Sequence, residues 1–387
     1  MKIKENPRAF IFAAVFLVMI AGIGTASLGK LINYYKGGEA DYNEWSPELG
    51  NKLETDMATS FYQKFNFVNL NGVVRNILGQ REMNGVVKLN NGYLLTTCPK
   101  VSDEYLQYDS ERVYALKKYL DETGIKFLYV ITPYTSGKYD PQLPIGIEDW
   151  GNDNLDRLSE MLEAKEIETL DLRETMHDDG IDHYDMMYRT DHHWTTRGGF
   201  YAYLKINEKL EKLLDCQVDP QVKDFSNYTV KTYESWHLGS RGQRTGVYYA
   251  GSDDFDLILP DFETAITCVG GVTDTYENLI VNMSALDNKN SMSRYTYDTT
   301  LENTELDYIN EYAFNDKKIL VLSDSFGKAV NGFLIMSYAE CRCAGVGVGR
   351  ELTYHYLEEY EPDAVIMLYY VNNAVSPGFY SFELPDE

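Results

Sequence analysis

The sequence predicts an α/β protein with a parallel sheet that helices cover on both faces. Short apolar runs at residues 125–131 and 364–371 have the length and composition of buried strands. Each run follows a segment with apolar residues at helical spacing, residues 110–124 before the first and residues 352–360 before the second. Strands that alternate with helices in this way are typical of a parallel sheet buried on both faces.

The amino terminus carries an uncharged apolar run at residues 9–28. As a helix, this run would cross a bilayer core of about 30 Å. Lys2, Lys4 and Arg8 precede it, so the positive-inside rule leaves the terminus in the cytoplasm and exports the rest of the chain. A cleavable signal peptide is the alternative, although its apolar region is usually shorter. We expect residues 1–29 to be a cytoplasmic tip and transmembrane anchor, or a signal peptide.

Two larger regions follow the apolar run. We expect residues 30–95 to form a linker and amino-terminal extension, because residues 37–56 are polar and acidic. Residues 96–387 then form one α/β domain. Inside it, residues 222–306 break the alternation with short aromatic and β-branched runs between glycines and charges, which indicates a β-rich or irregular insertion.

The remaining elements of the α/β domain also alternate. Leu155, Leu158 and Leu162 lie at helical spacing before an expected strand at residues 167–172. Further along, we expect a helix at residues 196–214, a strand at 318–322 and a helix at 328–338. In open α/β sheets, binding and catalytic sites gather at the carboxyl ends of such strands.

Charge and cysteine content restrict the function. A formal net charge of −25 repels nucleic acid and anionic glycopolymers, so we expect no nucleic-acid partner and a neutral or locally shielded substrate. The acidity could equally serve only to keep an exported protein soluble. Five scattered cysteines do not suit a disulfide scaffold or a zinc knuckle, and their odd number leaves at least one without a disulfide inside the chain.

The most reactive segment is Asp191, His192, His193 and Trp194. If it is locally extended, alternate side chains share a face, so Asp191 and His193 lie together while His192 points away. An imidazole can act as a base near neutral pH when a carboxylate holds its tautomer. We therefore predict His193 as the general base and Asp191 as its orienting acid, with Thr195 or Thr196 capping the following helix.

A nucleophile is available in a second segment, Leu322 to Gly327. Ser325 comes where a buried strand should end and a helix begin, with Gly327 close behind to permit a tight turn. Such a strand end exposes the hydroxyl, and the N–H groups of the helix can stabilise an oxyanion. A serine before a helix can also be only its N-cap.

Two other interpretations compete for the histidine segment. Nine Asp and His side chains lie between residues 177 and 193 and could bind a metal, but their spacing matches no helical His-x-x-x-His pair. The histidines could also be hydrogen-bonded core residues. We expect no metal and no cofactor.

At these residues the chain resembles a known group. Residues 188–195 (YRTDHHWT), followed by GGFY at 198–201, resemble the DHHW protein family, which is related to the SGNH-hydrolase-like domains of alginate and other polysaccharide O-acetyltransferases. Further similarity lies at residues 78–94, 322–327 and 363–373, so the resemblance spans about residues 60–375. It implies an SGNH-hydrolase-like, flavodoxin-like three-layer α/β/α fold.

The resemblance also implies functional residues. The relatives' Asp-x-His-Trp motif maps onto Asp191, His193 and Trp194, and their nucleophile onto Ser325 rather than Ser323. The remaining candidates are Gly239, Asn372 and Asn373 for the oxyanion, and Trp194, His192 and Arg197 for the substrate.

The implied function is that of an extracytoplasmic, membrane-anchored O-acyltransferase, most simply an O-acetyltransferase, that modifies a cell-surface or secreted polysaccharide. Because acetyl-CoA is cytoplasmic, a multi-spanning membrane acyltransferase is the expected donor partner. Two alternatives remain open: a carbohydrate esterase that uses the same triad, and a non-catalytic envelope protein that binds glycans or assists assembly.

Overall fold

The structure is a computed structural model that describes residues 7–36, 61–268, 270–297, 305–345, 352–376, 378–380 and 382–383. It divides into two compact units, Met1–Val74 and Arg75–Glu387. The expected linker at residues 37–56 lies outside the described residues. The three short strands up to residue 95 belong to the second of these units and are partly buried.

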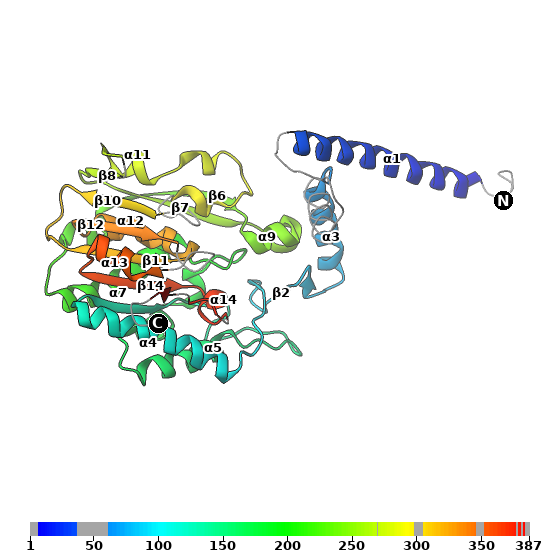
Figure 1. Ribbon diagram of the computed structural model, residues 1–387. Helices are drawn as coiled ribbons and strands as arrows, with labels where there is room; N and C mark the ends of the chain where they lie inside the picture. The colour runs from blue at the N-terminus through cyan, green and yellow to red at the C-terminus, as the bar shows by residue number, and fades with distance from the viewer. Residues whose placement is uncertain are drawn as a thin grey trace. The chain divides into compact units, whose positions relative to one another are not determined.

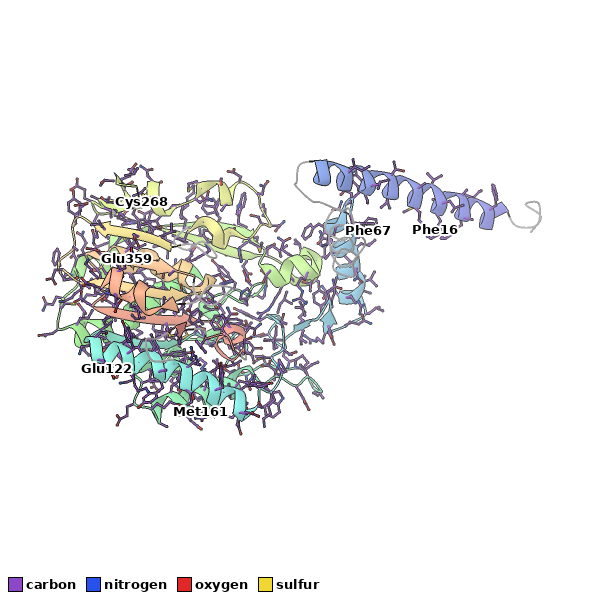
Figure 2. All side chains as sticks on the ribbon, viewed as in Figure 1. Phe16, Phe67, Glu122, Met161, Cys268 and Glu359 are labelled. Atoms are coloured by element: carbon purple, nitrogen blue, oxygen red, sulfur yellow. The ribbon has the colours of Figure 1, made fainter. Side chains whose placement is uncertain are left out.

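The described part of the first unit is mainly helical. Its α1 (Pro7–Lys36) contains one segment, Phe10–Gly29, that is long and apolar enough to cross a membrane. Its large apolar side chains are exposed, and Phe16 projects from the helix surface with 56% of its area accessible (Figure 2). A helix that is apolar all round needs an apolar surrounding, which agrees with the segment expected at residues 9–28. Another helix, α3, spans Lys64–Ile77 and extends past the end of this unit.

The second unit is organised around an eight-stranded sheet (Figure 1). Its order is β5-β4-β14-β11-β12-β10-β8-β9. The parallel part comprises β5 (Thr169–Asp171), β4 (Lys126–Ile131), β14 (Ala364–Tyr369), β11 (Lys318–Ser323) and β12 (Glu340–Ala344). The antiparallel edge comprises β10 (Glu305–Asn310), β8 (Ile266–Cys268) and β9 (Val272–Asp274).

The centre of the sheet is buried on both faces. Every residue of β14 is buried, and β11 is buried after its first residue. In β11, Val321 pairs with Ile366 on one side and with Cys343 on the other. Because β11 lies between two parallel neighbours, its carboxyl end is central among the carboxyl ends of the strands. The predicted nucleophile follows directly after this end.

Helices supply the covering layers. Their bounds are α4 (Asp103–Thr123), α5 (Gly151–Glu163), α6 (Leu172–Asp178), α7 (Thr196–Leu214), α12 (Lys328–Ile335), α13 (Tyr354–Tyr360) and α14 (Val371–Ala374). The predicted α/β class is confirmed, and α7 has the predicted bounds. α7 and α12 approach closely: a Cβ on Gly199 would lie 2.6 Å from the Cβ of Ala329.

The region predicted as an insertion, residues 222–306, has two parts. β6 (Tyr228–His237) and β7 (Asp253–Pro260) pair as an antiparallel ribbon, with α9 (Ser240–Thr245) and α10 (Val247–Ala250) between them. β8 and β9 instead extend the central sheet, so this region is β-rich as expected but is not wholly separate from the parallel core.

Short elements complete the unit. The remaining strands are β1 (Glu82–Met83), β2 (Val86–Lys88), β3 (Leu94–Leu95), β13 (Leu352–Thr353) and β15 (Phe382–Glu383). The remaining helical turns are α8 (Pro220–Lys223), α11 (Tyr276–Ile280), η2 (His183–Met186), η3 (Phe225–Asn227), η4 (Met283–Leu286), η5 (Ser293–Thr296) and η6 (Ser325–Gly327).

Asp109 gives the fold a testable pH dependence. It is buried on α4, and burial raises the pKa of its carboxyl to about 6 despite a hydrogen bond from the Gly378 N–H. Because the carboxyl of an unfolded chain has a pKa of about 3.9, the folded protein binds this proton more tightly. Stability should therefore fall as pH rises from about 4 to about 6.

Asp109→Asn should remove this part of the pH dependence, as measured by urea unfolding across that range. An unchanged slope in the variant would show that another group is responsible.

Candidate active site

The histidine segment forms a loop closed at its base. Met187 and Trp194 make an isolated antiparallel bridge, and the Tyr188 N–H donates to the His193 carbonyl at 3.1 Å. Thr195 follows directly and caps α7, since its Oγ1 accepts the Gly198 N–H at 3.0 Å. The base of the loop is therefore fixed by a strand pair and a helix start, which limits where its side chains can point.

Ser325 lies at the carboxyl end of β11. Asp324 is the N-cap of η6, and its Oδ1 accepts the Phe326 N–H at 2.9 Å. A Cβ on Gly327 would lie 2.2 Å from Ser323 Oγ, so space, rather than an unusual φ, requires glycine here. The expected strand, serine and tight turn are all present.

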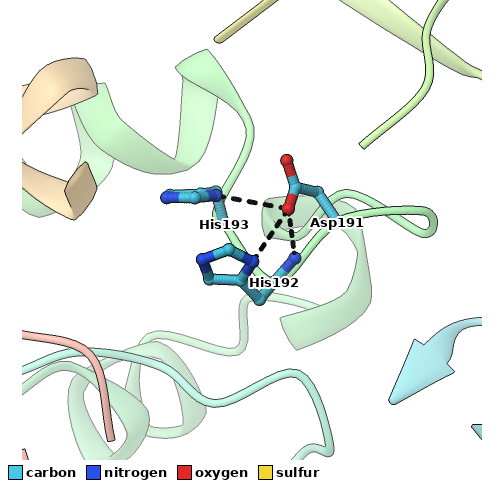
Figure 3. A group of neighbouring side chains, drawn as sticks. All are labelled: Asp191, His192 and His193. Carbon is cyan, nitrogen blue, oxygen red and sulfur yellow. Dashed lines mark hydrogen bonds and ion pairs between the residues drawn. The ribbon is translucent and has the colours of Figure 1, made fainter. Parts of the chain in front are cut away.

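The two segments meet although 132 residues separate them. His193 Nε2 lies 2.7 Å from Ser325 Oγ, and His193 Nδ1 lies 3.3 Å from Asp191 Oδ1. Figure 3 shows the second of these contacts, together with two from His192 that end on the same carboxylate oxygen. Asp191 is fully buried and His193 almost so. The structure thus brings acid, imidazole and hydroxyl into one continuous chain of contacts.

The predicted direction of His192 was wrong. Its Nδ1 lies 2.9 Å from Asp191 Oδ1 and its N–H donates to the same oxygen at 2.8 Å. The alternation argument assumed an extended segment, but residues 189–193 form consecutive bends, so His192 turns back to the carboxylate instead of away from it. The centroid of its ring lies 3.9 Å from that of the His193 ring and 5.2 Å from that of the Tyr370 ring.

The Asp191 carboxylate is the electrostatic centre of this cluster. Burial alone would raise the pKa of the Asp191 carboxyl, but the neighbouring His193 and His192 outweigh it and hold the pKa well below its usual range. Ser240 Oγ also donates to Asp191 Oδ1 at 2.8 Å, and His237 Nε2 lies 3.4 Å from Oδ2. The site therefore contains a buried carboxylate with polar groups on both of its oxygens.

A second buried acid connects Ser325 to the next strand end. Asp324 Oδ2 accepts the Tyr370 N–H and the Asn373 side-chain amide, each at 2.8 Å. Burial raises the pKa of the Asp324 carboxyl above its ordinary value, although these hydrogen bonds and the one from Phe326 oppose the rise. Asp324 thus holds the turn that carries Ser325 against Tyr370 and α14, which follow β14.

Ser325 opens into a cleft of about 340 Å³ at this sheet edge. The cleft is lined by Thr96, His192, Ser240, Arg241, Arg244, Asp324, Ser325, Tyr370, Asn372 and Asn373. Arg241 is buried and contacts Thr135 Oγ1, the Asp191 carbonyl and the Tyr370 hydroxyl at 2.6, 3.1 and 3.1 Å. Arg241 therefore connects three segments of the chain beside the cleft.

The oxyanion candidates occupy different positions. The Gly239 N–H donates to Thr190 Oγ1 at 2.9 Å, and a Cβ there would lie 2.2 Å from the Asp191 Cβ. This favours a packing role for Gly239 over an oxyanion role. Asn373 lines the cleft, but its side-chain N–H already donates to Asp324. Asn372 also lines the cleft and is exposed.

Two of the substrate-binding candidates do not line the cleft. Trp194 is 2% exposed, packs on Phe326 at 5.0 Å and donates its Nε1–H to the Phe326 carbonyl at 3.2 Å. It supports the Ser325 turn from within the core and cannot act as a sugar platform. Arg197 forms an ion pair with Asp256 and lies over the Phe225 ring. Of this group only His192 lines the cleft.

Sequence reasoning missed four polar residues of the site: Ser240, His237, Arg241 and Asp324. His237 ends β6, and Ser240 and Arg241 begin α9, so these three lie inside the region predicted as an insertion. The string His-Leu-Gly-Ser-Arg at 237–241 was a usable signal, because polar side chains packed around glycine after a strand often mark a site.

Asp191, His192 and His193 also place three possible metal ligands within 4.8 Å of one another. Asp191 Oδ1, however, already accepts the His192 N–H and Ser240 Oγ. We therefore expect EDTA to leave the unfolding temperature unchanged, and elemental analysis to find far less than one transition-metal ion per chain. Stoichiometric zinc whose removal destabilises the protein would instead make this a metal centre.

Comparison with known proteins gives a family-model match over part of the chain. Residues 95–235, which include Asp191 and His193, match the family model described as the SGNH hydrolase-like domain of the acetyltransferase AlgX. A comparison with curated proteins gave no significant match.

Solved structures show the same fold over most of the chain. Bacillus cereus PatB1 is 20% identical, with a TM-score of 0.62 over 76% of this chain and 98% of its own. Its form with a sulfonyl adduct has the same TM-score and identity, over 77% and 99%. A DHHW family protein from Eubacterium siraeum is 16% identical, with a TM-score of 0.59 over 77% and 94%. The resemblance indicated by the sequence is confirmed, and the chain has an SGNH hydrolase-like fold.

Proposed function

We propose that this protein is an O-acyltransferase, most simply an O-acetyltransferase, that modifies a polysaccharide outside the cytoplasm. The observation that carries the proposal is the 2.7 Å contact between His193 Nε2 and Ser325 Oγ, with Asp191 on the other ring nitrogen. The match of residues 95–235 to an acetyltransferase family model supports the choice of reaction.

In the first step, Ser325 attacks the acyl donor. His193 takes the hydroxyl proton at Nε2 as the new C–O bond forms, and Asp191 stabilises the resulting imidazolium. The neighbouring histidines hold the pKa of the buried Asp191 carboxyl below its usual range, which favours the ionised form. The donor's leaving group then takes the proton from His193, which leaves an acyl-serine.

In the second step, a sugar hydroxyl of the acceptor takes the place of the leaving group. His193 deprotonates this hydroxyl as it attacks the acyl-serine. The bond between the acyl carbon and Ser325 Oγ then breaks, and His193 returns the proton to Ser325 Oγ, which releases the acylated sugar and restores the enzyme. Each step passes through an oxyanion that needs hydrogen-bond donors. Asn372 is the best placed of the predicted donors, because it is exposed on the cleft wall and the other two donate elsewhere.

The apolar segment of α1 gives the proposal a location. Anchored by Phe10–Gly29, the α/β unit would lie on the extracytoplasmic side of the cell membrane, with the charged amino terminus in the cytoplasm. An acetyl group from cytoplasmic acetyl-CoA would then reach Ser325 through a multi-spanning membrane acyltransferase. If the segment is cleaved as a signal peptide, the enzyme is secreted.

An esterase would use the same three residues with water in place of the sugar. The two reactions differ in how well the site excludes water while it holds an acceptor. If Ser325 does not react, the cleft would serve only to bind, and the protein would be a glycan-binding or assembly factor.

Activation of Ser325 can be tested without knowing the substrate. Because PatB1 is known with a sulfonyl adduct, phenylmethylsulfonyl fluoride is a suitable probe for this fold. Ser325→Ala should abolish labelling, and His193→Ala should slow it by about 10²- to 10⁴-fold, since the general base is lost.

Intact-protein mass spectrometry measures the labelling rate. His177→Ala is the matched control, because His177 stacks on Tyr139 outside the cleft, and this variant should label at the native rate. Equal rates in all three variants would remove the basis of the proposed mechanism.

Transferase and esterase activity can be separated with a chromogenic acetyl ester and oligosaccharide acceptors. A transferase should acetylate the acceptor and turn over the ester faster when the acceptor is present. Mass spectrometry of the sugars gives the product directly. Acetate release that acceptors do not affect, with no acetylated sugar, would establish the esterase instead.

A further inference from the structure

A third histidine approaches the Asp191 carboxylate from the far side. His237 is the last residue of β6 and is fully buried. Its Nε2 lies 3.4 Å from Asp191 Oδ2, and its ring packs on Tyr188 at 4.3 Å between centroids. No part of the mechanism proposed above uses this residue.

The backbone determines which nitrogen of His237 carries the proton. The Ser293 N–H donates to His237 Nδ1 at 3.0 Å, so Nδ1 must present its lone pair. In the neutral ring the proton is therefore on Nε2, the nitrogen that faces Asp191. A buried N–H without an acceptor costs about 1–3 kcal/mol, and among the described residues the Asp191 carboxylate is the acceptor that this group faces.

The two oxygens of Asp191 then have separate partners. Oδ1 receives the contacts from His192, His193 and Ser240, while Oδ2 faces His237. In Figure 3 the three dashed lines end on one oxygen, and the other oxygen points away from both histidine rings. A donor on the second oxygen resists rotation of the carboxylate about its Cβ–Cγ bond, and this rotation would otherwise take Oδ1 away from His193.

We propose that His237 is a positioning residue, which donates its Nε2–H to Asp191 Oδ2 and holds the carboxylate in the orientation that aligns His193 with Ser325. This inference rests on the proposed roles of Asp191, His193 and Ser325. The His237 side chain does not line the cleft, so it acts through Asp191 alone. The residue comes from the ribbon region, which makes this part of the chain necessary for the site.

The test compares two substitutions at His237 in the full chain. His237→Phe fills the space without a donor, whereas the amide of His237→Gln can restore the donor at the Nε2 position. Labelling of Ser325 by phenylmethylsulfonyl fluoride should slow by about 10- to 100-fold in the Phe variant, by analogy with the loss seen when partners that orient metal-bound histidines are removed. The Gln variant should label within about threefold of the native rate. Equal slowing in both would overturn the proposal.

A double-mutant cycle with Asp191→Asn distinguishes positioning from general loosening of the core. If His237 acts through the carboxylate, His237→Phe should slow labelling much less in the Asp191→Asn background than in the native one. Additive slowing would contradict the proposal, because a purely structural defect acts whether or not the carboxylate is present.

A second measurement does not depend on Ser325 reactivity. Long-range ¹H–¹⁵N correlation spectra of histidine-labelled protein should show His237 protonated at Nε2 alone, with a proton resonance that moves in Asp191→Asn. Protonation at Nδ1, or an Nε2 proton whose chemical shift is the same in Asp191→Asn, would overturn the inference even if Ser325 is reactive. If Ser325 proves unreactive while the predicted tautomer and its shift are found, the proposed function fails but the contact between His237 and Asp191 stands.

Discussion

The site depends on one buried negative charge. A carboxylate without access to water is tolerated only when donors surround it, and Asp191 has His192, His193 and Ser240 on one oxygen and His237 facing the other. These partners come from the histidine loop, the turn after β6 and the end of β6 itself. The requirement to satisfy this charge therefore fixes the relative positions of segments that are distant in the chain, and His193 acquires its direction toward Ser325 as a result.

The sheet supplies the other half of the geometry. β11 lies between β14 and β12, so the turn after it cannot move sideways, and Asp324 connects it to the backbone after β14. Trp194 reaches under the same turn and holds the Phe326 carbonyl. Ser325 therefore follows a central strand, and His193 lies in a separate loop. The two segments are joined by the contact between His193 and Ser325 and by the hydrogen bond from Trp194 to the Phe326 carbonyl. This arrangement places the Ser325 hydroxyl and the His193 imidazole 2.7 Å apart.

Local patterns predicted what depends on local structure. The helix at residues 196–214 and the strands at 126–131 and 364–369 follow from periodicity, and Ser325 follows from its place after a buried strand. His192 was misplaced because alternation holds only in extended backbone, and this loop bends at each residue. The string at residues 237–241 marks His237 and Ser240 as candidates, but their proximity to Asp191 could not be predicted, because it arises from a ribbon whose packing no local pattern reports. For the same reason, an exposed and a buried Trp194 could not be distinguished from sequence.

The most direct test of the account is to locate an acyl group on the protein. After a brief exposure to an activated acetyl ester, peptide mass spectrometry should find acetyl on Ser325 in the native chain and none there in His193→Ala. Acetyl groups on surface lysines alone, or equal acetylation of Ser325 in both proteins, would contradict the claim that the buried Asp191 charge and His193 together activate this serine.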